Sequence, residues 1–418
     1  MIQKTLHQQT LKNSSRICDW YSAKTESLPS VIYSSYDIRD SGYKITNVDA
    51  NIFPAGFNNI CPADKESSVA VFDRYLVKHY AQPIKNILLV SEEHTNNPYY
   101  WENIATLQEL VSNSGRNIKI GFAKKLDAPM VLESTTGKKI TVESAEFGSS
   151  LYEKFKPDLI VNNNDFSEAR EEWAMKIDLP MNPPRELGWY QRKKSRYFKY
   201  YNQMVNEFSE AAGIDPFFMR VETDMYEHFD INDDKSRNDL ADRVDAFISK
   251  LEIEYQKRKI DQKPFVFVKN NAGTYGLAVI RVGSGQEVRE WSYKSRKKMK
   301  AAKGGREIEE VIIQEGIPSI VQADGASAEP VIYMIGCELA GGFLRTHAEK
   351  SSTDSLNSPG AIYKKLCVSD LTDRAAGCPM ENVYGWTAKL GLLAIGLEAQ
   401  EMKVEFKGFK NAACGKSL

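Results

Sequence analysis

The stretch PFVFVKNNAGTYGLAVIRV (264–282) places two apolar runs on either side of a short loop that contains two glycines. Such runs predict two strands joined in a hairpin, whose turn needs the backbone freedom of glycine. Lys269 ends the first run, immediately before the loop. Because glycine lets backbone N–H groups approach an anion closely, the loop and the lysine together could hold a phosphate. The stretch alone is equally typical of a hairpin with a lysine on the surface.

Residues that suit ATP chemistry follow this hairpin along the chain. Mg²⁺ prefers oxygen ligands from one or two carboxylates and from phosphates. Transfer of a γ-phosphoryl group needs that metal and cations around the charged oxygens. Three strand-like runs and one turn-rich loop supply such residues: Gln314 and Glu315 in VIIQEG (311–316), Glu329 in AEPVIYMI (328–335), Arg345 in GGFLRTH (341–347), and Asp354 and Asn357 in STDSLNSPG (352–360).

Hydrophobic patterns divide the chain into three parts. Strand-like runs over 85–92 and 117–123 flank a helical pattern over 98–115, which predicts an open, largely parallel sheet. Amphipathic patterns over 196–213 and 239–259 predict helices that pack on a core. From residue 264 the pattern returns to strands. The sequence therefore predicts an α/β (α+β) fold with an N-terminal open α/β domain over 1–185, a helical linker region over 186–262 and a C-terminal domain over 263–418.

Composition excludes several classes of protein. The chain has 418 residues, 42% hydrophobic and 27% charged, with a formal net charge of −1. No global field favours nucleic acid or an anionic membrane, and residues 1–16 lack the apolar core of a signal peptide. The most apolar stretch, residues 386–402, is interrupted by Lys389 and is shorter than the roughly 20 residues of a membrane span. It predicts a buried helix.

The cysteines and histidines form no metal-binding motif. Five histidines are dispersed, and the six cysteines contain no C-x-x-C pair. The pattern therefore indicates free thiols and predicts that the protein is located in the reducing cytoplasm. They are Cys18, Cys61, Cys337, Cys367, Cys378 and Cys414.

Two basic stretches raise the alternative of nucleic-acid binding. Residues 190–201 interleave cations with aromatic residues, as single-strand sites do, but the helical spacing of these aromatics is explained by core packing. Residues 293–306 form a denser basic run, which is typical of a solvated helix or loop. We expect no nucleic-acid partner.

With these features assembled, the chain resembles the ATP-grasp ligases, and within them the proteobacterial ATP-grasp type of glutamate–cysteine ligase. The similarity covers most of the chain. An acid is usual in this family where Asn271 stands, and an asparagine is usual at Ser355. The resemblance rests on VDANIFPAGFNN (48–59), which is the most family-specific segment, and on PPRELGWYQRKKSRYF (183–198), VKNNAGTYG (268–276), VIIQEG (311–316), EPVIYMI (329–335), GGFLRTH (341–347) and SLNSPG (355–360).

The resemblance implies a C-terminal ATP-grasp domain and a reaction through an acyl phosphate. ATP would phosphorylate the γ-carboxylate of glutamate, and the amine of cysteine would then displace phosphate to give γ-glutamylcysteine, the precursor of glutathione. A glycine-rich lid would exclude water, because an acyl phosphate hydrolyses. The implied cofactors are ATP and Mg²⁺, and the implied partners are small-molecule substrates, without a membrane and with a possible homo-oligomer.

The resemblance also implies roles for individual residues. Lys269 and Lys194 would hold the phosphates, with Lys193 as the competing candidate for the first lysine. Gly273, Thr274, Tyr275 and Gly276 would form the lid, and Gln314 and Glu315 would line the base and ribose. Glu329, Asn357 and Asp354 would bind magnesium, and Arg345 would stabilise charge on the transferring group. Arg345, Asn51, Asn58 and Arg185 would bind substrate.

Other interpretations of these residues stay open at this point. Arg345 could be an ordinary ion-pair residue, Glu329 a turn acid, Asp354 part of an Asx turn, and Arg185 a solvated side chain. Turn chemistry could account for the asparagines of residues 51–59. The chain could also be another ATP-grasp carboxylate–amine ligase, such as a glutathione-synthetase-like enzyme, or a nucleotide-binding regulatory protein without turnover.

Overall fold

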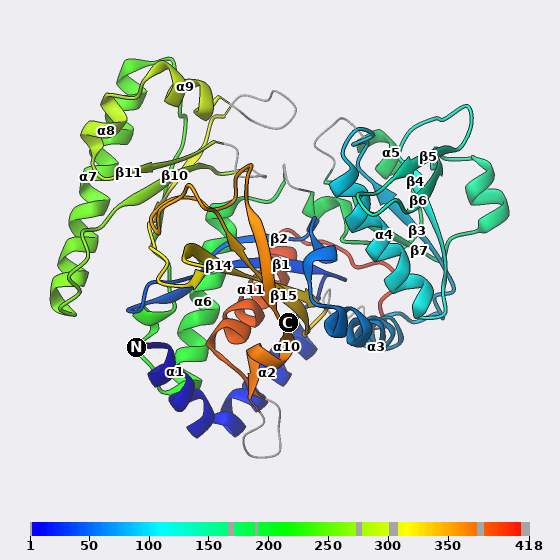
Figure 1. The fold of residues 1–418 in the computed structure, drawn as a ribbon, viewed down its shortest axis with the longest axis horizontal. Coiled ribbons are helices and arrows are strands. Elements are labelled where there is room, and N and C mark those ends of the chain that lie inside the picture. The colour runs from blue at the N-terminus through cyan, green and yellow to red at the C-terminus, as the bar shows by residue number, and fades with distance from the viewer. Residues whose placement is uncertain are drawn as a thin grey trace.

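The computed structural model describes residues 2–165, 171–188, 191–272, 278–300, 308–373 and 380–410. These residues form a mixed α/β structure in which a central antiparallel sheet lies between a largely parallel sheet and a smaller antiparallel sheet (Figure 1). The predicted α/β fold class is thereby confirmed. Gly273, Thr274, Tyr275 and Gly276 of the predicted lid lie outside the described residues.

The central sheet combines strands from both ends of the sequence. Its order is β16 (Ile362–Leu366), β15 (Glu338–Thr346), β14 (Ala326–Ile335), β1 (Ser34–Asp40) and β2 (Ile45–Asn51), and β13 (Gln322–Ala323) also pairs with β14. Side chains of β14 alternate between two cores, as the two-residue period of a strand requires. Ile332 and Met334 pack against helices α6 (Lys194–Ala212) and α11 (Val383–Glu401), whereas Val331 and Tyr333 face the side of α3 (Pro62–His79).

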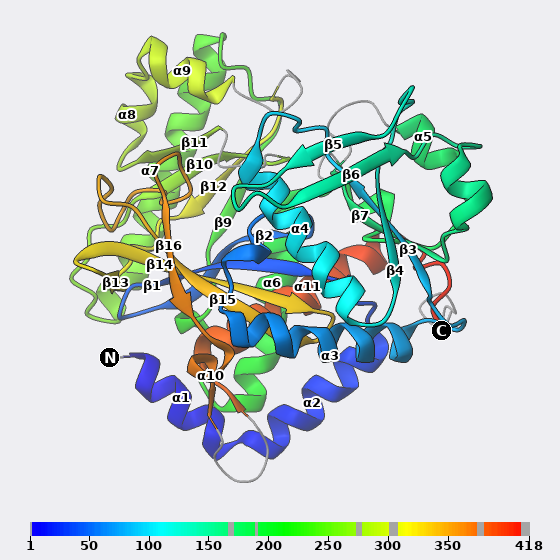
Figure 2. The same ribbon diagram turned by 45° about the vertical axis from the view of Figure 1, so that its right-hand side comes forward.

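The second sheet follows the strand–helix rhythm predicted for the first part of the chain. It is parallel except for β5, and its order is β5 (Met130–Glu133), β6 (Lys139–Ser144), β4 (Asn117–Phe122), β3 (Asn86–Ser91), β7 (Leu159–Asn163) and β8 (Met181–Asn182). Helices α3 and α4 (Pro98–Asn113) pack in the core between this sheet and the central sheet (Figure 2).

The third sheet contains the hairpin of residues 264–282. Its order is β11 (Val279–Val282), β10 (Val266–Asn270), β12 (Val311–Glu315) and β9 (Thr223–Tyr226), all antiparallel. Lys269 lies opposite Val279 in the register, which confirms the predicted pairing. Helices α7 (Asp234–Lys257), α8 (Gly285–Arg289) and α9 (Tyr293–Met299) lie beside it (Figure 1).

Helix α11 is the buried helix that the apolar stretch near the C-terminus predicts. Side chains on all of its faces are buried. Gly391 faces Tyr36 of β1 and Tyr197 of α6, and a Cβ atom there would come within 2.5 Å and 2.7 Å of these two side chains. Glycine therefore lets this helix pack directly between the strand and the helix that carry site residues. None of the described helices is long and apolar enough to span a bilayer.

Further short and peripheral elements complete the described structure. They are α1 (Ile2–Lys12), α2 (Ser14–Ser27), α5 (Glu171–Lys176), α10 (Val368–Leu371) and the strand pair β17 (Thr372–Asp373) and β18 (Met380–Glu381), with short 3₁₀ helices η1 (Phe57–Asn59), η3 (Arg185–Leu187) and η4 (Pro216–Phe218) and a single π turn η2 (Leu151–Phe155).

The sheets divide the chain differently from the predicted ranges 1–185, 186–262 and 263–418. Strands β1 and β2 fall in the predicted N-terminal domain, yet they complete the sheet of β14, β15 and β16. Strand β9 lies in the predicted linker and pairs with β12. Since pairing between segments distant in the sequence leaves no local pattern, the periodicity could not reveal these partners.

Candidate active site

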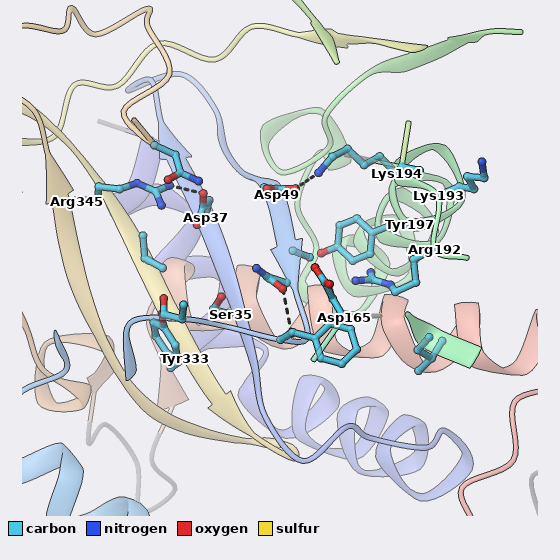
Figure 3. Close-up of a pocket in the computed structure, with 18 of the residues that line it drawn as sticks. Ser35, Asp37, Asp49, Asp165, Arg192, Lys193, Lys194, Tyr197, Tyr333 and Arg345 are labelled. Carbon is cyan, nitrogen blue, oxygen red and sulfur yellow. Dashed lines mark hydrogen bonds and ion pairs between the residues drawn. The ribbon is translucent and has the colours of Figure 1, made fainter. Parts of the chain in front are cut away.

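Two pockets meet at the edges of the central sheet and the hairpin sheet. The hairpin pocket is lined by Phe267, Lys269 and Val279 of the hairpin, and the loop pocket by Asn51, Phe53 and Ala55 of the segment after β2, each with further residues. The pockets share five lining residues, which form their common wall: Asp37, Asp49, Lys194, Arg345 and Asn357. Figure 3 shows that Lys194 extends toward Asp49, whereas Lys193 points away.

The two adjacent lysines at the start of α6 have different partners. Lys194 pairs with Asp49 on the common wall, while Lys193 pairs with Glu310 at 3.1 Å. Lys194 also lines both pockets, but Lys193 lines only the loop pocket. The geometry therefore favours Lys194 as the lysine that faces a ligand in the hairpin pocket.

Asn271, where an acid is usual in the resembled family, ties the hairpin to the start of α6. Its backbone oxygen accepts from Lys194 N–H at 2.8 Å, and its side-chain oxygen accepts from Ser195 N–H at 2.9 Å. Its amide nitrogen donates to Glu310 Oε2 at 2.8 Å. An ionised acid has no proton to donate, so the amide is the group that can serve both neighbours. The carboxylate at this place belongs to Glu310.

Lys269 is a buried cation held by neutral groups. Its Nζ atom donates to the Val48 carbonyl at 3.1 Å and to Gln314 Oε1 at 2.5 Å. Burial lowers the pKa of Lys269 to about 8, although Asp49 acts in the opposite direction. Among the described cations that line the hairpin pocket, the others each pair with a carboxylate. Lys269 therefore has the most to gain from an anionic ligand.

A buried network of two arginines and two acids forms the floor of the hairpin pocket. Glu329 accepts from Arg345 Nε at 2.8 Å, and its second oxygen pairs with Arg39. Arg345 also pairs with Asp37. Burial raises the pKa of Glu329, but the two arginines outweigh it and hold that pKa below its ordinary value. Glu329 is therefore a carboxylate that positions arginines, and its predicted role at a metal has no direct support in this geometry.

The common wall places two carboxylates opposite each other. Asp37 of β1 and Asp49 of β2 are partners in the register, and like charges in that position destabilise a sheet unless cations compensate. Burial raises the pKa of Asp37 to about 6, although Arg345 opposes the rise. Burial also acts on Asp49, but Lys194 and Lys269 hold its pKa below the ordinary value. The pair offers oxygen ligands of the kind that Mg²⁺ prefers, with Asn357 on the same wall.

Gln314 and Glu315 lie at the end of β12. Their oxygens already accept hydrogen bonds, whereas the buried Nε2 atom of Gln314 has no partner among the described residues. Gln314 is fully buried and accepts from Lys269. Glu315 is also fully buried, accepting from Lys44 Nζ at 2.7 Å and 2.8 Å and from Tyr255 at 2.9 Å. Glu315 lines the hairpin pocket, so its contacts fix the pocket wall.

Several predicted residues lie away from the two pockets or at their margin. The Asp354 carboxylate accepts from Ser351 within its own loop at 2.8 Å, as an Asx-type acid does. Arg185 pairs with the adjacent Glu186 and is partly exposed. The described lining residues include neither of these two, nor Asn58, whose amide contacts Asn59. Asn51 does line the loop pocket, and Ser355 lines the hairpin pocket.

The sequence interpretation missed five charged residues that line the pockets: Asp37, Arg39, Asp49, Asp165 and Arg192. Asp49 had a signal, because it belongs to the segment VDANIFPAGFNN that carries the resemblance. Asp165 ends the polar cluster after β7, and parallel strands gather such residues at their carboxyl edge. Asp37 and Arg39 alternate with apolar residues in a run that reads as an ordinary strand.

Comparisons with known proteins identify the family and the fold. A family model described as glutamate-cysteine ligase matches residues 7–399. The crystal structure of a provisionally named gamma-glutamylcysteine synthetase from Methylobacillus flagellatus KT has a TM-score of 0.82 and 32% identity, over 95% of this chain and 96% of that chain. A glutathione synthetase-like effector from Globodera pallida has a TM-score of 0.40 at 10% identity over 86% of each chain, too low to support an argument. No protein with a curated description is similar enough to count as a relative.

Proposed function

The chain belongs to the glutamate–cysteine ligase family, and we propose that its two joined pockets hold ATP and the amino acids on opposite sides of one reaction centre. The family activity makes the chain an ATP-dependent ligase that joins the γ-carboxylate of glutamate to the amine of cysteine. The products are γ-glutamylcysteine, ADP and phosphate. This is the first step of glutathione biosynthesis.

The observation that carries the proposal is the wall common to both pockets. A phosphoryl group must pass from a nucleotide to a carboxylate, so the two ligands need to meet at a single place with charges of both signs. Asp37, Asp49, Lys194, Arg345 and Asn357 line both pockets and provide such a place. Because these residues come from β1, β2, α6, β15 and the loop after it, the meeting point is set by the rigid core.

We assign the hairpin pocket to ATP. Lys269 and Lys194 would contact the phosphates, because Lys269 has only neutral partners and Lys194 reaches the common wall. Glu315, which accepts hydrogen bonds from Lys44 and Tyr255, would form the part of the pocket wall that contacts the base and ribose. The loop of residues 273–276 would cover the phosphates, as the resemblance implies.

The loop pocket would hold the amino acids. Asn51 and Asp165 line it, and these side chains can accept hydrogen bonds from an α-ammonium group. Arg345 would hold the reacting carboxylate at the common wall, where its buried guanidinium also stabilises charge on the transferring phosphoryl group. The γ-carboxylate oxygen forms a bond to the γ-phosphorus while the bond to ADP breaks. The amine of cysteine then attacks the acyl carbon, and phosphate leaves.

The residues of the common wall fit magnesium. Two opposed carboxylates and one amide oxygen are hard ligands that suit this ion. Asp37, Asp49 and Asn357 would hold it, whereas Glu329 would keep Arg345 in position. When bound, magnesium would supply positive charge next to the phosphate oxygens.

Release of ADP tests the proposed function. We expect ADP only when ATP, Mg²⁺, glutamate and cysteine are all present, together with a product of the mass of γ-glutamylcysteine. Release with other acid and amine pairs, but not with this one, would overturn the assignment. Tight ATP binding without turnover on any pair would indicate a regulatory protein.

The proposed setting is the cytoplasm, where ATP is available and thiols stay reduced. Among the described residues, no disulfide joins Cys18, Cys61, Cys337 or Cys367. We propose small-molecule partners only, with no nucleic acid, and a possible homo-oligomer. Elution of the chain from heparin below physiological salt would support the absence of nucleic-acid binding.

A further inference from the structure

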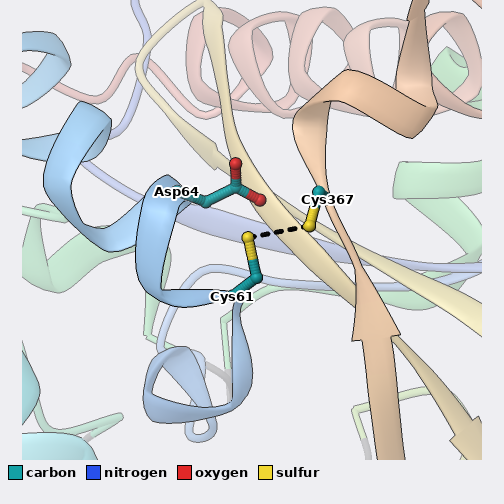
Figure 4. A group of neighbouring side chains, drawn as sticks. All are labelled: Cys61, Asp64 and Cys367. Atoms are coloured by element: carbon teal, nitrogen blue, oxygen red, sulfur yellow. Dashed lines mark hydrogen bonds between the residues drawn. The ribbon is translucent and has the colours of Figure 1, made fainter.

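Two cysteines that the reaction does not use lie in contact outside the common wall. Cys61 precedes α3 and Cys367 precedes α10, and their Sγ atoms are 2.8 Å apart (Figure 4). Cys61 is buried, while Cys367 is partly exposed. The sequence offered no hint of this pair, because 306 positions separate the two residues.

The distance between the sulfurs favours a covalent bond over a shared metal. Two thiolates on a tetrahedral zinc ion, each at about 2.3 Å, would lie about 3.8 Å apart. In this structure the atoms are closer than that, and a disulfide bond of about 2.05 Å requires an approach of less than about 1 Å. The nearby Asp64 could serve as a third metal ligand, since the three ligand atoms lie within 4.8 Å. Its carboxylate, however, already accepts from Val368 N–H at 3.0 Å.

We propose that Cys61 and Cys367 are a modification site, at which a small-molecule disulfide oxidises the two thiols to a reversible intramolecular disulfide. The thiolate of Cys367, which is the more accessible of the two residues, attacks the reagent RS–SR, forms a mixed disulfide and releases one RS⁻. Cys61 then attacks the Cys367 sulfur and releases the second RS⁻. Two protein thiols are oxidised, the reagent is reduced to two thiols, and the two protein protons end on those thiols.

The bridge would join two segments that build the loop pocket. Phe53 and Ala55 line that pocket shortly before Cys61, and Tyr363 of β16 lines it four residues before Cys367. The rings of Tyr363 and Phe343 are in edge contact, with centroids 4.9 Å apart, so this part of the wall is already packed. A covalent link across it would restrict its opening. This consequence, unlike the bridge itself, rests on the proposed function of the loop pocket.

The surroundings make the exchange slow at neutral pH. Burial, Cys61 and Asp64 raise the pKa of Cys367 to about 11, although Lys365 acts in the opposite direction. Because the thiolate is the attacking species, the rate of bridge formation should rise about tenfold per pH unit between pH 7 and 9.

Mass spectrometry of the full chain after treatment with 2-hydroxyethyl disulfide tests the proposal. We expect a loss of two hydrogens and a peptide that links Cys61 to Cys367, both reversed by dithiothreitol. The bridged form should melt several degrees higher than the reduced form. Cys61→Ser and Cys367→Ser should each abolish the linked peptide, while Cys337→Ser, which removes another partly buried thiol, should retain it.

Three results would overturn the proposal. One is the formation of mixed disulfides only, without the linked peptide. The second is a stoichiometric zinc content in the reduced chain that protects both thiols, which would assign the cluster to a metal. The third is an equal melting temperature for the bridged and reduced forms.

A separate assay, after removal of the reagent, tests the effect on the pocket. With a thiol-free amine in place of cysteine, which would reduce the bridge, we expect kcat/KM for glutamate to fall at least about threefold on bridging while KM for ATP stays constant. An unchanged kcat/KM would overturn the link to the loop pocket. The mass measurement needs no turnover, so it distinguishes failure of the bridge from failure of the proposed function.

Discussion

The two sheets that border the site hold their charges in opposite ways. On the central sheet, the guanidinium of Arg345 lies between the carboxylates of Asp37 and Glu329, so its charge is neutralised before any ligand binds. On the hairpin sheet, Lys269 is held by a carbonyl and an amide oxygen, and its pKa falls to about 8. The first arrangement fixes a geometry. The second leaves a positive charge that a ligand can neutralise.

This difference separates two requirements of the reaction. The reacting groups need a rigid frame, since small displacements cost large factors in rate. The nucleotide needs a cation whose interaction improves when phosphate arrives. A single cation cannot meet both requirements well. A cation already paired with carboxylates gains less interaction energy from a phosphate than a cation held by neutral groups.

Removing the cation of the central sheet should have the largest effect. Arg345→Met leaves Asp37 and Glu329 buried with less compensating charge, so we expect a loss of about 3–5 kcal/mol in the free energy of unfolding and no measurable ligase activity. Urea unfolding and ADP release measure the two effects. The matched control is Arg185→Met at a partly exposed pair, which should change stability by less than about 0.5 kcal/mol. Equal stability for Arg345→Met and the wild type would contradict a structural role for Arg345.

Removing the cation of the hairpin sheet should affect activity and spare the fold. Lys269→Met is expected to lower kcat/KM for ATP by about 10²–10³, because one donor to the transferring charge is lost. Stability should change little, since the loss of a donor to Val48 and Gln314 is offset by the removal of a buried charge and no carboxylate loses a direct partner. Lys193→Met, which alters the lysine paired with Glu310, is the matched control and should retain most activity. A strong loss of stability in Lys269→Met would show that both sheets use their cations in the same way.

The amide that joins the hairpin to α6 provides a smaller test. Asn271→Asp removes the donor to Glu310 and places two carboxylates in contact, so we expect a loss of about 1–3 kcal/mol in stability. The second substitution Glu310→Gln restores a donor and should recover most of that loss. Thermal unfolding of the single and double variants measures the coupling. No recovery in the double variant would contradict the explanation given for Asn271.

The smallest expected effect is the pH dependence of the hairpin cation. The protonated form of Lys269 binds phosphate, and that form is lost as the pH rises through about 8. We therefore expect kcat/KM for ATP to fall by up to tenfold per pH unit above about pH 8. The midpoint of this fall should report the pKa of Lys269 in the free enzyme. Because the pKa is below the ordinary 10.5, this group should make the free chain more stable as the pH rises from about 8 to 10.5. A profile that is flat to pH 9.5 would show that Lys269 does not control binding.

The parts of the fold that the sequence predicted are those with a local pattern. The strand–helix alternation of residues 85–123, the hairpin at Lys269 and the apolar helix at residues 383–401 each carry their own periodicity. The central sheet could not be predicted, because β1 and β14 lie almost 300 residues apart and the local sequence of neither strand indicates its partner. The sequence already favoured Lys194 over Lys193, and the pairing of Lys194 with Asp49 on another element agrees with that choice.

The candidate site shows the same division. Residue types in strand-like runs pointed to Lys269 and Arg345, and the turn-rich loop 352–360 pointed to Asn357; all three line the pockets. The acids were harder to assign, because a carboxylate can bind a metal, hold an arginine or close a turn with the same local sequence. Glu329 holds two arginines while lining the hairpin pocket, Asp354 closes its own loop, and Asp37 and Asp49 line both pockets.

The pairing of β1 with β14 also sets an order of events during synthesis. Ser34 pairs with Met334, so the first strand of the central sheet waits for 300 further residues. At roughly 5–20 residues per second, that wait lasts about 15–60 s. The parallel sheet, complete at residue 182, can form in the meantime. During this interval β1 and β2 can pair only with each other, so the edge of β1 that later pairs with β14 stays exposed. Completion of the central sheet therefore depends on a long-range contact that forms late.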